Sequence, residues 1–402
     1  MRPSSLLFSL FLAATLAACD DTKLAAPKSC VGPGCIVVTT GRYNPDFTGV
    51  GTLNTVELPG NKITTAIDAT LDPDVDLATR GEELLVLNRT TGTLRLYDAR
   101  TWQVKVEAST GDATHPAAAS IPSSMYWRPG SLEVLVSFGG NDKDHAIGVV
   151  DLAQPAAGVV RWISVAPDAA DPDGKPEPST FYACGDKLYV LQQSYSIDFA
   201  SFTVTYYPAS ILQLDAKQPS AVERTITLVG KNPTSITAAG AGCDKVLVST
   251  SGNLSTVPDG ASGIESVELG KSASSGFLLT DQQLSGRATS VIGVSASLAF
   301  LAEWTDLVPD EQGFVYLSSA KVVAFNPSTK ALLGDVTKKA GNVAFVKLSP
   351  DNRLFVGTGL FNNMAEAGKL KRGLYFGTAD GTGLSDSGLD LVDTPSAIAF
   401  EQ

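Results

Sequence analysis

The strongest constraint on the fold of this sequence is an internal repeat of roughly 54 residues. Seven short runs rich in Leu, Val and Ile recur along the chain, and they begin at Cys35, Leu84, Leu132, Lys187, Lys245, Leu298 and Arg353. A second signature precedes most runs, and its prolines at 122, 178 and 233 are 56 and 55 residues apart. Pro395 lies 162 residues beyond Pro233, which is three further steps of 54. Repeats of about 50 residues with several strands per unit are typical of β-propellers. The sequence therefore predicts an all-β, seven-bladed propeller.

The two ends of the repeat array complement each other. The strands of a propeller blade run A, B, C, D from the central channel outward, and here the proline segments match strand A and the apolar runs match strand B. The first B strand, at Cys35, has no A strand ahead of it, and the last A strand, residues 396–400, has nothing after it. We therefore expect the C-terminal strand to join the N-terminal blade and close one ring over residues 35–402. An open sandwich explains neither the seven copies nor the complementary ends.

One segment of the repeat resembles a known family. The stretch from Leu85 to Asp98 reads Leu-Val-Leu-Asn-Arg-Thr-Thr-Gly-Thr-Leu-Arg-Leu-Tyr-Asp. It resembles the YVTN-type propeller repeat, in which a Tyr-Val-Thr-Asn-like strand precedes a strand that ends in aspartate. The likeness covers about residues 35 to 402, but Glu268 and Asn326 replace the aspartate in later blades and no copy reads Tyr-Val-Thr-Asn. The resemblance implies the propeller fold and specifies no ligand.

The N-terminus has the order of a secretory signal peptide. Arg2 is followed by an apolar stretch over residues 6–16 and then by Leu16-Ala17-Ala18-Cys19. The stretch is roughly half as long as a membrane-spanning helix. Its last four residues resemble the lipobox of bacterial lipoproteins, which implies removal of residues 1–18, diacylglycerol on the Cys19 thiol and a further acyl chain such as palmitate. An ordinary signal peptide with Cys19 present by chance is the alternative.

This resemblance implies a protein of the bacterial cell envelope. Two or three acyl chains anchor a protein stably to a membrane, and residues 19–34 would then be the lipidated cysteine and its linker, with the propeller outside the cytoplasm. Asp20 resembles an inner-membrane retention signal of enteric bacteria, but the choice between the inner and outer membrane stays open. A net charge of −12 argues against nucleic acid as a partner. The short basic run at Lys369, Lys371 and Arg372 is expected to be a solvated loop.

Four further cysteines can form disulfides, because export exposes them to an oxidising compartment. They are Cys30, Cys35, Cys184 and Cys243, and they allow three pairings. Cys30 and Cys35 enclose a Val-Gly-Pro-Gly turn, and Cys184 and Cys243 fall at similar blade positions. A disulfide and two free buried thiols both remain open for the second pair.

Catalytic patterns are scarce. The chain has two histidines, His115 and His145, and neither lies in a Ser-His-Asp context. No Cys-x-x-Cys-His occurs, which excludes c-type haem. The recognisable A strands present small groups, namely Ser123, Ser179, Thr234 and Ser396. We therefore expect no catalytic residues and no cofactor, although a hydrolase similar to propeller lactonases remains the alternative.

Two acidic segments are candidates for calcium, which oxygen ligands bind. Asp72, Asp74 and Asp76 alternate, with Glu83 eleven residues after Asp72, but Leu77 stands where an EF-hand loop requires glycine. The second segment is Asp168-Ala-Ala-Asp171-Pro-Asp173-Gly174. A solvated connector is the favoured interpretation, so no metal site is predicted.

The long loops between B and C strands lie on one end of the ring, which we call the top face, and they are the expected binding surface. They span residues 43–50, 194–208, 252–263, 304–318 and 360–372. Their aromatic and acidic residues are of types that recognition surfaces favour, namely Tyr195, Phe199, Tyr206, Tyr207, Trp304, Asp306, Asp310, Glu311 and Phe361. Packing of these aromatics between loops is the alternative. The sequence thus predicts a non-enzymatic binding or scaffold module with a protein or glycan partner, with a purely structural envelope component as a further alternative.

Overall fold

The B strands form from uninterrupted apolar runs because neighbouring blades cover both of their faces. In β5 (Glu83–Asn88) the side chains of residues 84–87, which read Leu-Leu-Val-Leu, are all 0 % exposed. Strands buried on both faces read as such continuous runs, whereas half-exposed strands alternate. The computed structural model describes residues 34–43, 49–58, 60–116, 122–169, 171–198, 203–253, 258–284, 286–309, 315–338, 341–359 and 370–400.

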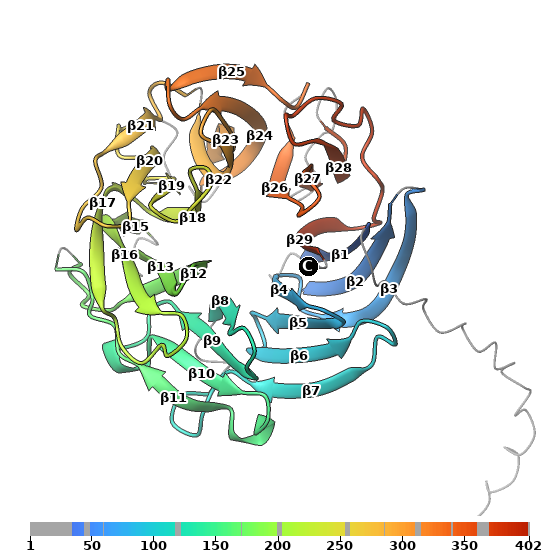
Figure 1. The fold of residues 1–402 in the computed structure, drawn as a ribbon, viewed down its shortest axis with the longest axis vertical. Helices are drawn as coiled ribbons and strands as arrows, with labels where there is room; N and C mark the ends of the chain where they lie inside the picture. Colours follow the sequence, from blue (N-terminus) through green and yellow to red (C-terminus); the bar gives the residue numbers. More distant parts are fainter. Residues whose placement is uncertain are drawn as a thin grey trace, which may run out of the picture.

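The described residues form seven sheets arranged in a ring, with one strand of each sheet nearest the ring axis (Figure 1). Blade 1 contains β4 (Val75–Arg80), β5, β6 (Thr93–Asp98) and β7 (Val104–Ser109). Blade 2 contains β8 (Pro122–Trp127), β9 (Glu133–Phe138), β10 (Ile147–Asp151) and β11 (Val159–Ile163), with short 3₁₀ turns η2 (Lys143–His145) and η3 (Pro155–Ala157). Blade 3 contains β12 (Glu177–Cys184), β13 (Lys187–Gln193), β16 (Pro208–Asp215) and β17 (Arg224–Lys231).

The second half of the ring repeats this order. Blade 4 contains β18 (Pro233–Ala238), β19 (Lys245–Thr250), β20 (Gly263–Glu268) and β21 (Phe277–Thr280). Blade 5 contains β22 (Arg287–Ser295), β23 (Leu298–Pro309), β24 (Val315–Asn326) and β25 (Ala331–Asp335). Blade 6 contains β26 (Asn342–Leu348), β27 (Arg353–Gly359) and β28 (Gly373–Thr378). The predicted all-β, seven-bladed propeller is confirmed.

Blade 7 closes the ring from both ends of the chain. It contains β29 (Thr394–Phe400), β1 (Cys35–Tyr43), β2 (Gly49–Glu57) and β3 (Lys62–Leu71). β29 lies antiparallel to β1, with partners running from Ile36↔Phe400 to Gly41↔Thr394. The C-terminal strand is thus the innermost strand of the N-terminal blade, as the complementary ends of the repeat predict (Figure 1).

Apolar packing follows the blade interfaces. The described buried residues form seven hydrophobic clusters, and each cluster combines residues of two adjacent blades. One cluster joins Val136 of blade 2 to Leu94 of blade 1, and another joins Val37 of blade 7 to Leu84 of blade 1. Each blade therefore completes its core only with its neighbours, which is why the ring must close.

A disulfide adds a covalent link between blades 3 and 4. Cys184, the last residue of β12, is bonded to Cys243 in the β18–β19 turn, and their Cα atoms are 5.6 Å apart. Cys35 is also disulfide-bonded. Cys30 and Cys19 lie outside the described residues. Within the described part of the chain, no helix is long and apolar enough to cross a membrane.

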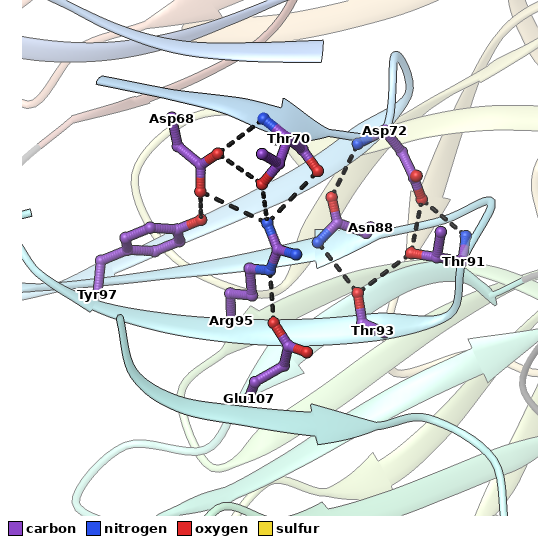
Figure 2. A network of polar contacts seen from close by, with 9 residues as sticks. All are labelled: Asp68, Thr70, Asp72, Asn88, Thr91, Thr93, Arg95, Tyr97 and Glu107. Atoms are coloured by element: carbon purple, nitrogen blue, oxygen red, sulfur yellow. Dashed lines mark hydrogen bonds and ion pairs between the residues drawn. The ribbon is translucent and has the colours of Figure 1, made fainter. Parts of the chain in front are cut away.

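A polar network joins blade 7 to blade 1 (Figure 2). Tyr97 Oη donates to Asp68 Oδ2 at 2.6 Å, and Arg95 Nη1 lies 3.4 Å from the same oxygen. The Thr70 N–H donates to Asp68 Oδ1 at 2.7 Å, while Arg95 Nε donates to Glu107 at 2.7 Å. Burial alone would raise the pKa of Asp68, but the hydrogen bonds from Tyr97 and Thr70 and the Arg95 charge lower it overall. The ionised form of Asp68 therefore stabilises the interface between blades 7 and 1.

Candidate functional site

Strand direction defines the top face of the ring. Neighbouring strands within each blade are antiparallel, so strand A runs away from this face, B returns to it, C leaves it and D returns. The B–C loops and the connectors from strand D to the next strand A consequently lie at one end. They include the loops between β9 and β10, β13 and β16, and β23 and β24, and the connectors β7–β8, β11–β12 and β21–β22.

Two β-hairpins enlarge this face. The β13–β16 loop contains a separate two-stranded sheet, β14 (Tyr195–Asp198) paired with β15 (Thr203–Tyr206). In blade 5 the β22–β23 ladder ends at Arg287↔Trp304, but the β23–β24 ladder continues to Pro309↔Val315. The expectation of a loop over residues 304–318 was wrong for most of that range, because its Leu, Val and Tyr residues favour continued strand pairing.

Three of the predicted binding residues hold the β14–β15 hairpin together. Tyr195 and Tyr206 are directly paired, and their ring centroids are 5.8 Å apart. Burial raises the pKa of Tyr195 to about 12 and also raises the pKa of Tyr206. Tyr207 Oη and Ser196 Oγ share a hydrogen bond of 3.1 Å. The tyrosines therefore pack largely within the hairpin, whereas Ile197 is 40 % exposed on it.

The other predicted binding residues fall in different surroundings. Trp304 lies within β23, half-buried against the cluster between blades 5 and 6, and Asp306 lies farther along the same strand. Trp304 is thus a blade residue rather than a loop residue. The remaining ones lie outside the described residues: Phe199, Asp310, Glu311 and Phe361.

The two histidines meet on the top face between blades 1 and 2. Their ring centroids are 3.5 Å apart with planes inclined by 25°. His145 Nδ1 and Asp142 Oδ1 are 2.7 Å apart, and each histidine could offer one ligand atom to a metal together with Asp142. Imidazole lone pairs lie in the ring plane, so the lone pairs of two stacked rings lie in nearly parallel planes and do not converge on one ion. The sequence could not predict this stack, because the histidines belong to different loops.

A carboxylate cluster lies where the β11–β12 connector enters β12. Asp171, Asp173 and Glu177 each place an oxygen within 4.8 Å of the other two. Glu177 is 1 % exposed and Asp171 is 8 % exposed. Burial raises the pKa of Glu177 to about 9, and the charges of Asp171 and Asp173 contribute to the shift. Burial is also the main cause of the raised pKa of Asp171. Such a cluster can hold either a proton or a cation.

The sequence located only part of this cluster. Asp171 and Asp173 belong to the second calcium candidate, whereas Asp168 of the same segment is not in the cluster. Glu177 was not predicted as a functional residue, because it directly precedes Pro178 of the repeat signature. Blades 4 and 5 have Asn232 and Arg287 at the equivalent position, but blade 1 also has an acid there, Asp74, so the sequence signal was weak.

The aspartates of the first calcium candidate form hydrogen bonds and an ion pair with other residues of the protein. Asp72 Oδ2 accepts from the Thr91 N–H at 2.7 Å (Figure 2). Asp74 pairs with Arg89 at 2.9 Å. Asp76 Oδ2 accepts from Ser124 Oγ at 2.8 Å, and β4 begins between these acids at Val75. Asp76 thus links blade 1 to blade 2, whereas Asp72 and Asp74 bind the segment after β5, and the three aspartates do not form an ion-binding loop.

The comparisons with known proteins concern the fold. No protein-family model matches the chain, and no curated protein matches it. The solved structure of dihydro-heme d1 dehydrogenase NirN in complex with DHE is similar, with a TM-score of 0.51 and 15 % identity over 90 % of this chain and 68 % of that one. The computationally designed Ika8 protein has a TM-score of 0.50 and 10 % identity over 93 % of this chain and 94 % of that one. BamB from Moraxella catarrhalis has a TM-score of 0.43 and 13 % identity over 77 % of this chain and 78 % of that one. At these identities, the likeness to NirN and Ika8 shows that the chain shares the propeller fold and assigns it no activity.

Proposed function

We propose that this chain is a lipid-anchored recognition module of the bacterial cell envelope, which binds a protein or glycan partner through its top face. The observation that carries the proposal is the presence of two additional hairpins on that one face, β14–β15 and the outer part of β23–β24. Ring closure requires neither hairpin, because the blade ladders are complete without them. Binding residues are commonly carried by segments that a rigid scaffold positions in this way.

The entry point of the linker supports the proposed orientation. Cys35 begins β1 and pairs with Glu57 near the β2–β3 turn, so it lies at the end of blade 7 opposite the β1–β2 loop. The Leu58 N–H donates to the Gly34 carbonyl at 2.7 Å, which fixes the first described residue at that end. An anchor at Cys19 would therefore hold the bottom of the ring near the bilayer and direct the top face outward.

A hydrolase of the lactonase type is the second candidate function. The observation that favours it is the convergence of Asp171 and Glu177, both with raised pKa values, on the top face, because perturbed acids mark catalytic sites. A general acid must, however, reach the atom that it protonates. Glu177 is 1 % exposed, so recognition by the hairpins is the better-supported function.

A matched pair of variants tests the proposed binding face. Ile197 on the hairpin is 40 % exposed and Val160, on the outer strand of blade 2, is 43 % exposed. We expect Ile197→Asp to weaken partner capture from envelope extracts at least about tenfold, as loss of an interface anchor does. Val160→Asp should leave capture unchanged, and both should keep the parent melting temperature. Equal effects of the two variants on capture would contradict the assignment of the face.

A further inference from the structure

Glu177 is a buried carboxylate that forms no ion pair and no close hydrogen bond with the described residues. Neither of its carboxylate oxygens has a hydrogen-bond partner among the described residues, and Asp171 Oδ2 is likewise buried and unpartnered. The ion pairs of the described part of the chain include none of the three acids of the cluster. An uncompensated carboxylate costs several kcal/mol to bury, so native proteins pair it, protonate it or bind it to a metal.

The internal repeat identifies the residues equivalent to Glu177. In four blades the register of the inner ladder aligns Pro178↔Gln192, Val75↔Asn88, Pro233↔Thr250 and Ala288↔Glu303. The residues just before these inner-strand positions are therefore equivalent, namely Glu177, Asp74, Asn232 and Arg287. All four residues therefore lie at the start of an inner strand, at the top face of the ring.

The other three residues of this set each have a partner among the described residues. Asp74 pairs with Arg89 at 2.9 Å, Asn232 Oδ1 accepts from Gln193 Nε2 at 2.8 Å, and Arg287 pairs with Asp281 at 3.1 Å. In blade 3 the counterpart of Arg89 is Gln193, which donates to Asn232 of the next blade. Blade 3 thus retains the acid of blade 1 and lacks its cation.

We propose that Asp171, Asp173 and Glu177 bind a calcium ion at the junction of blades 2 and 3. Their oxygens lie within 4.8 Å of one another, and ligands about 2.4 Å from a shared Ca²⁺ are at most about 5 Å apart. A donor set made only of oxygens suits a hard cation rather than zinc. Ca²⁺ also accepts the irregular geometry of a loop, whereas Mg²⁺ requires a nearly ideal octahedron.

Two hydrogen bonds constrain the described residues of this connector. Asp171 Oδ1 accepts from the Asp173 N–H at 3.1 Å, which leaves Asp171 Oδ2 for another ligand. Gln192 Nε2 donates to the Ala166 carbonyl at 3.2 Å and ties the connector to β13. Gln192 Oε1 in β13 and Ser194 Oγ just after this strand are buried and have no hydrogen-bond partner among the described residues, so two more oxygens of the type that calcium uses lie along this segment.

The site adjoins the base of the β14–β15 hairpin. A Cβ atom added to Gly139 of blade 2 would lie 3.5 Å from Tyr195 Oη and 3.9 Å from Glu177 Cβ, so all three residues meet at this junction. A bound ion would neutralise the acids beneath the hairpin and tie blade 2 to blade 3. This role goes beyond partner recognition and does not depend on it.

Thermal unfolding of the full chain after chelator treatment tests the site. We expect millimolar CaCl2 to raise the melting temperature of the parent by about 3 °C or more, because a ligand that binds only the folded state stabilises it. The rise should be lost in Glu177→Gln and Asp171→Asn. The control Asp186→Asn removes an exposed acid from the β12–β13 turn of the same blade, and it should retain the rise.

The melting temperatures of the calcium-free proteins show whether a variant has lost the calcium site or the fold. Glu177→Gln removes a buried carboxylate, so without calcium it should melt at least as high as the parent. Terbium bound at the cluster should emit when tyrosine is excited, because Tyr195 lies at the same junction, and CaCl2 should reduce this emission far more than equal MgCl2. The proposal is overturned if calcium leaves the parent unchanged, as expected for a proton shared by Asp171 and Glu177. Equal displacement by magnesium, or an undiminished calcium response in Glu177→Gln, would overturn it as well.

Discussion

The hydroxyl groups of Thr39 in β1 and Ser396 in β29 are joined by a hydrogen bond of 3.1 Å, although 357 positions separate the two residues. This contact lies in the middle of the ladder through which the C-terminus completes the N-terminal blade. β29 also buries Ile398 and Ala399 in the clusters at the two neighbouring interfaces. The closure of the ring therefore depends on the last described strand of the chain.

Deletion of residues 396–402 should destabilise the whole propeller. The deletion removes the inner strand of blade 7 and leaves the backbone groups of β1 unpaired in a buried position, so we expect a loss of at least about 4 kcal/mol. Ser396→Ala is the control, because it removes one hydroxyl bond worth about 1 kcal/mol. Chemical denaturation measures both. Similar stabilities of the deletion and the parent would show that the strand is dispensable.

The Asp68 network should make part of the stability depend on pH. The pKa of Asp68 is lowered in the folded protein, so its contribution is fully present above the unfolded value of about 3.9 and is lost as the pH falls through the folded value. Asp68→Asn should therefore cost about 1–3 kcal/mol at neutral pH and progressively less below about pH 4. Denaturation curves at several pH values measure the difference.

Two variants check that this effect belongs to the network. Tyr97→Phe removes the donor to Asp68 and should lower stability and raise the pKa of Asp68. Glu107→Gln changes a carboxylate that is itself well exposed and should cost less than about 1 kcal/mol. A pH-independent effect of Asp68→Asn would argue against an ionised Asp68 at this interface.

Loss of the disulfide should weaken the link between blades 3 and 4. The bond joins residues 59 positions apart, so it restricts the unfolded chain considerably. We expect the double variant Cys184→Ser/Cys243→Ser to lose about 2–4 kcal/mol, and reduction of the parent to have a similar effect. Denaturation with and without reductant measures this. A parent insensitive to reductant and equal in stability to the double variant would contradict the link.

The repeat determined how much of the fold was predictable. Leu84 to Leu87 and their counterparts form apolar runs that only strands buried on both faces explain, and Pro122, Pro178 and Pro233 set the period. Because the repeat array begins with a B strand and ends with an A strand, the pairing of β29 with β1 could be predicted as well. The β14–β15 hairpin was not predicted, because its pairing depends on tertiary support for short polar strands rather than on a hydrophobic period.

The candidate calcium site could not be predicted in full for a different reason. Blade 3 has Gln193 in place of Arg89, the residue that pairs with Asp74 in blade 1, and Gln193 donates to Asn232 of the next blade. Composition identified Asp171 and Asp173 as acids in a loop, but it could not show that Glu177 is buried beside them. Only the structure shows which buried polar groups have hydrogen-bond partners.

The lipid anchor remains a prediction from the lipobox. Cys19→Ser should abolish incorporation of a labelled fatty acid and leave the protein uncleaved or released from membranes. Ser249→Ala, a substitution within blade 4, should leave labelling unchanged. Metabolic labelling with immunoprecipitation measures both. Equal label in the Cys19→Ser variant and the parent would end the lipoprotein assignment.

Site-specific photocrosslinking in intact cells tests the proposed binding face most directly. A photoreactive residue at position 197 lies on the β14–β15 hairpin, and one at position 160 lies on the outer strand of blade 2, with similar exposure of the native side chains. We predict a discrete partner adduct from position 197 and none from position 160. The same adduct from both positions, or an adduct from position 160 alone, would contradict recognition through the top face.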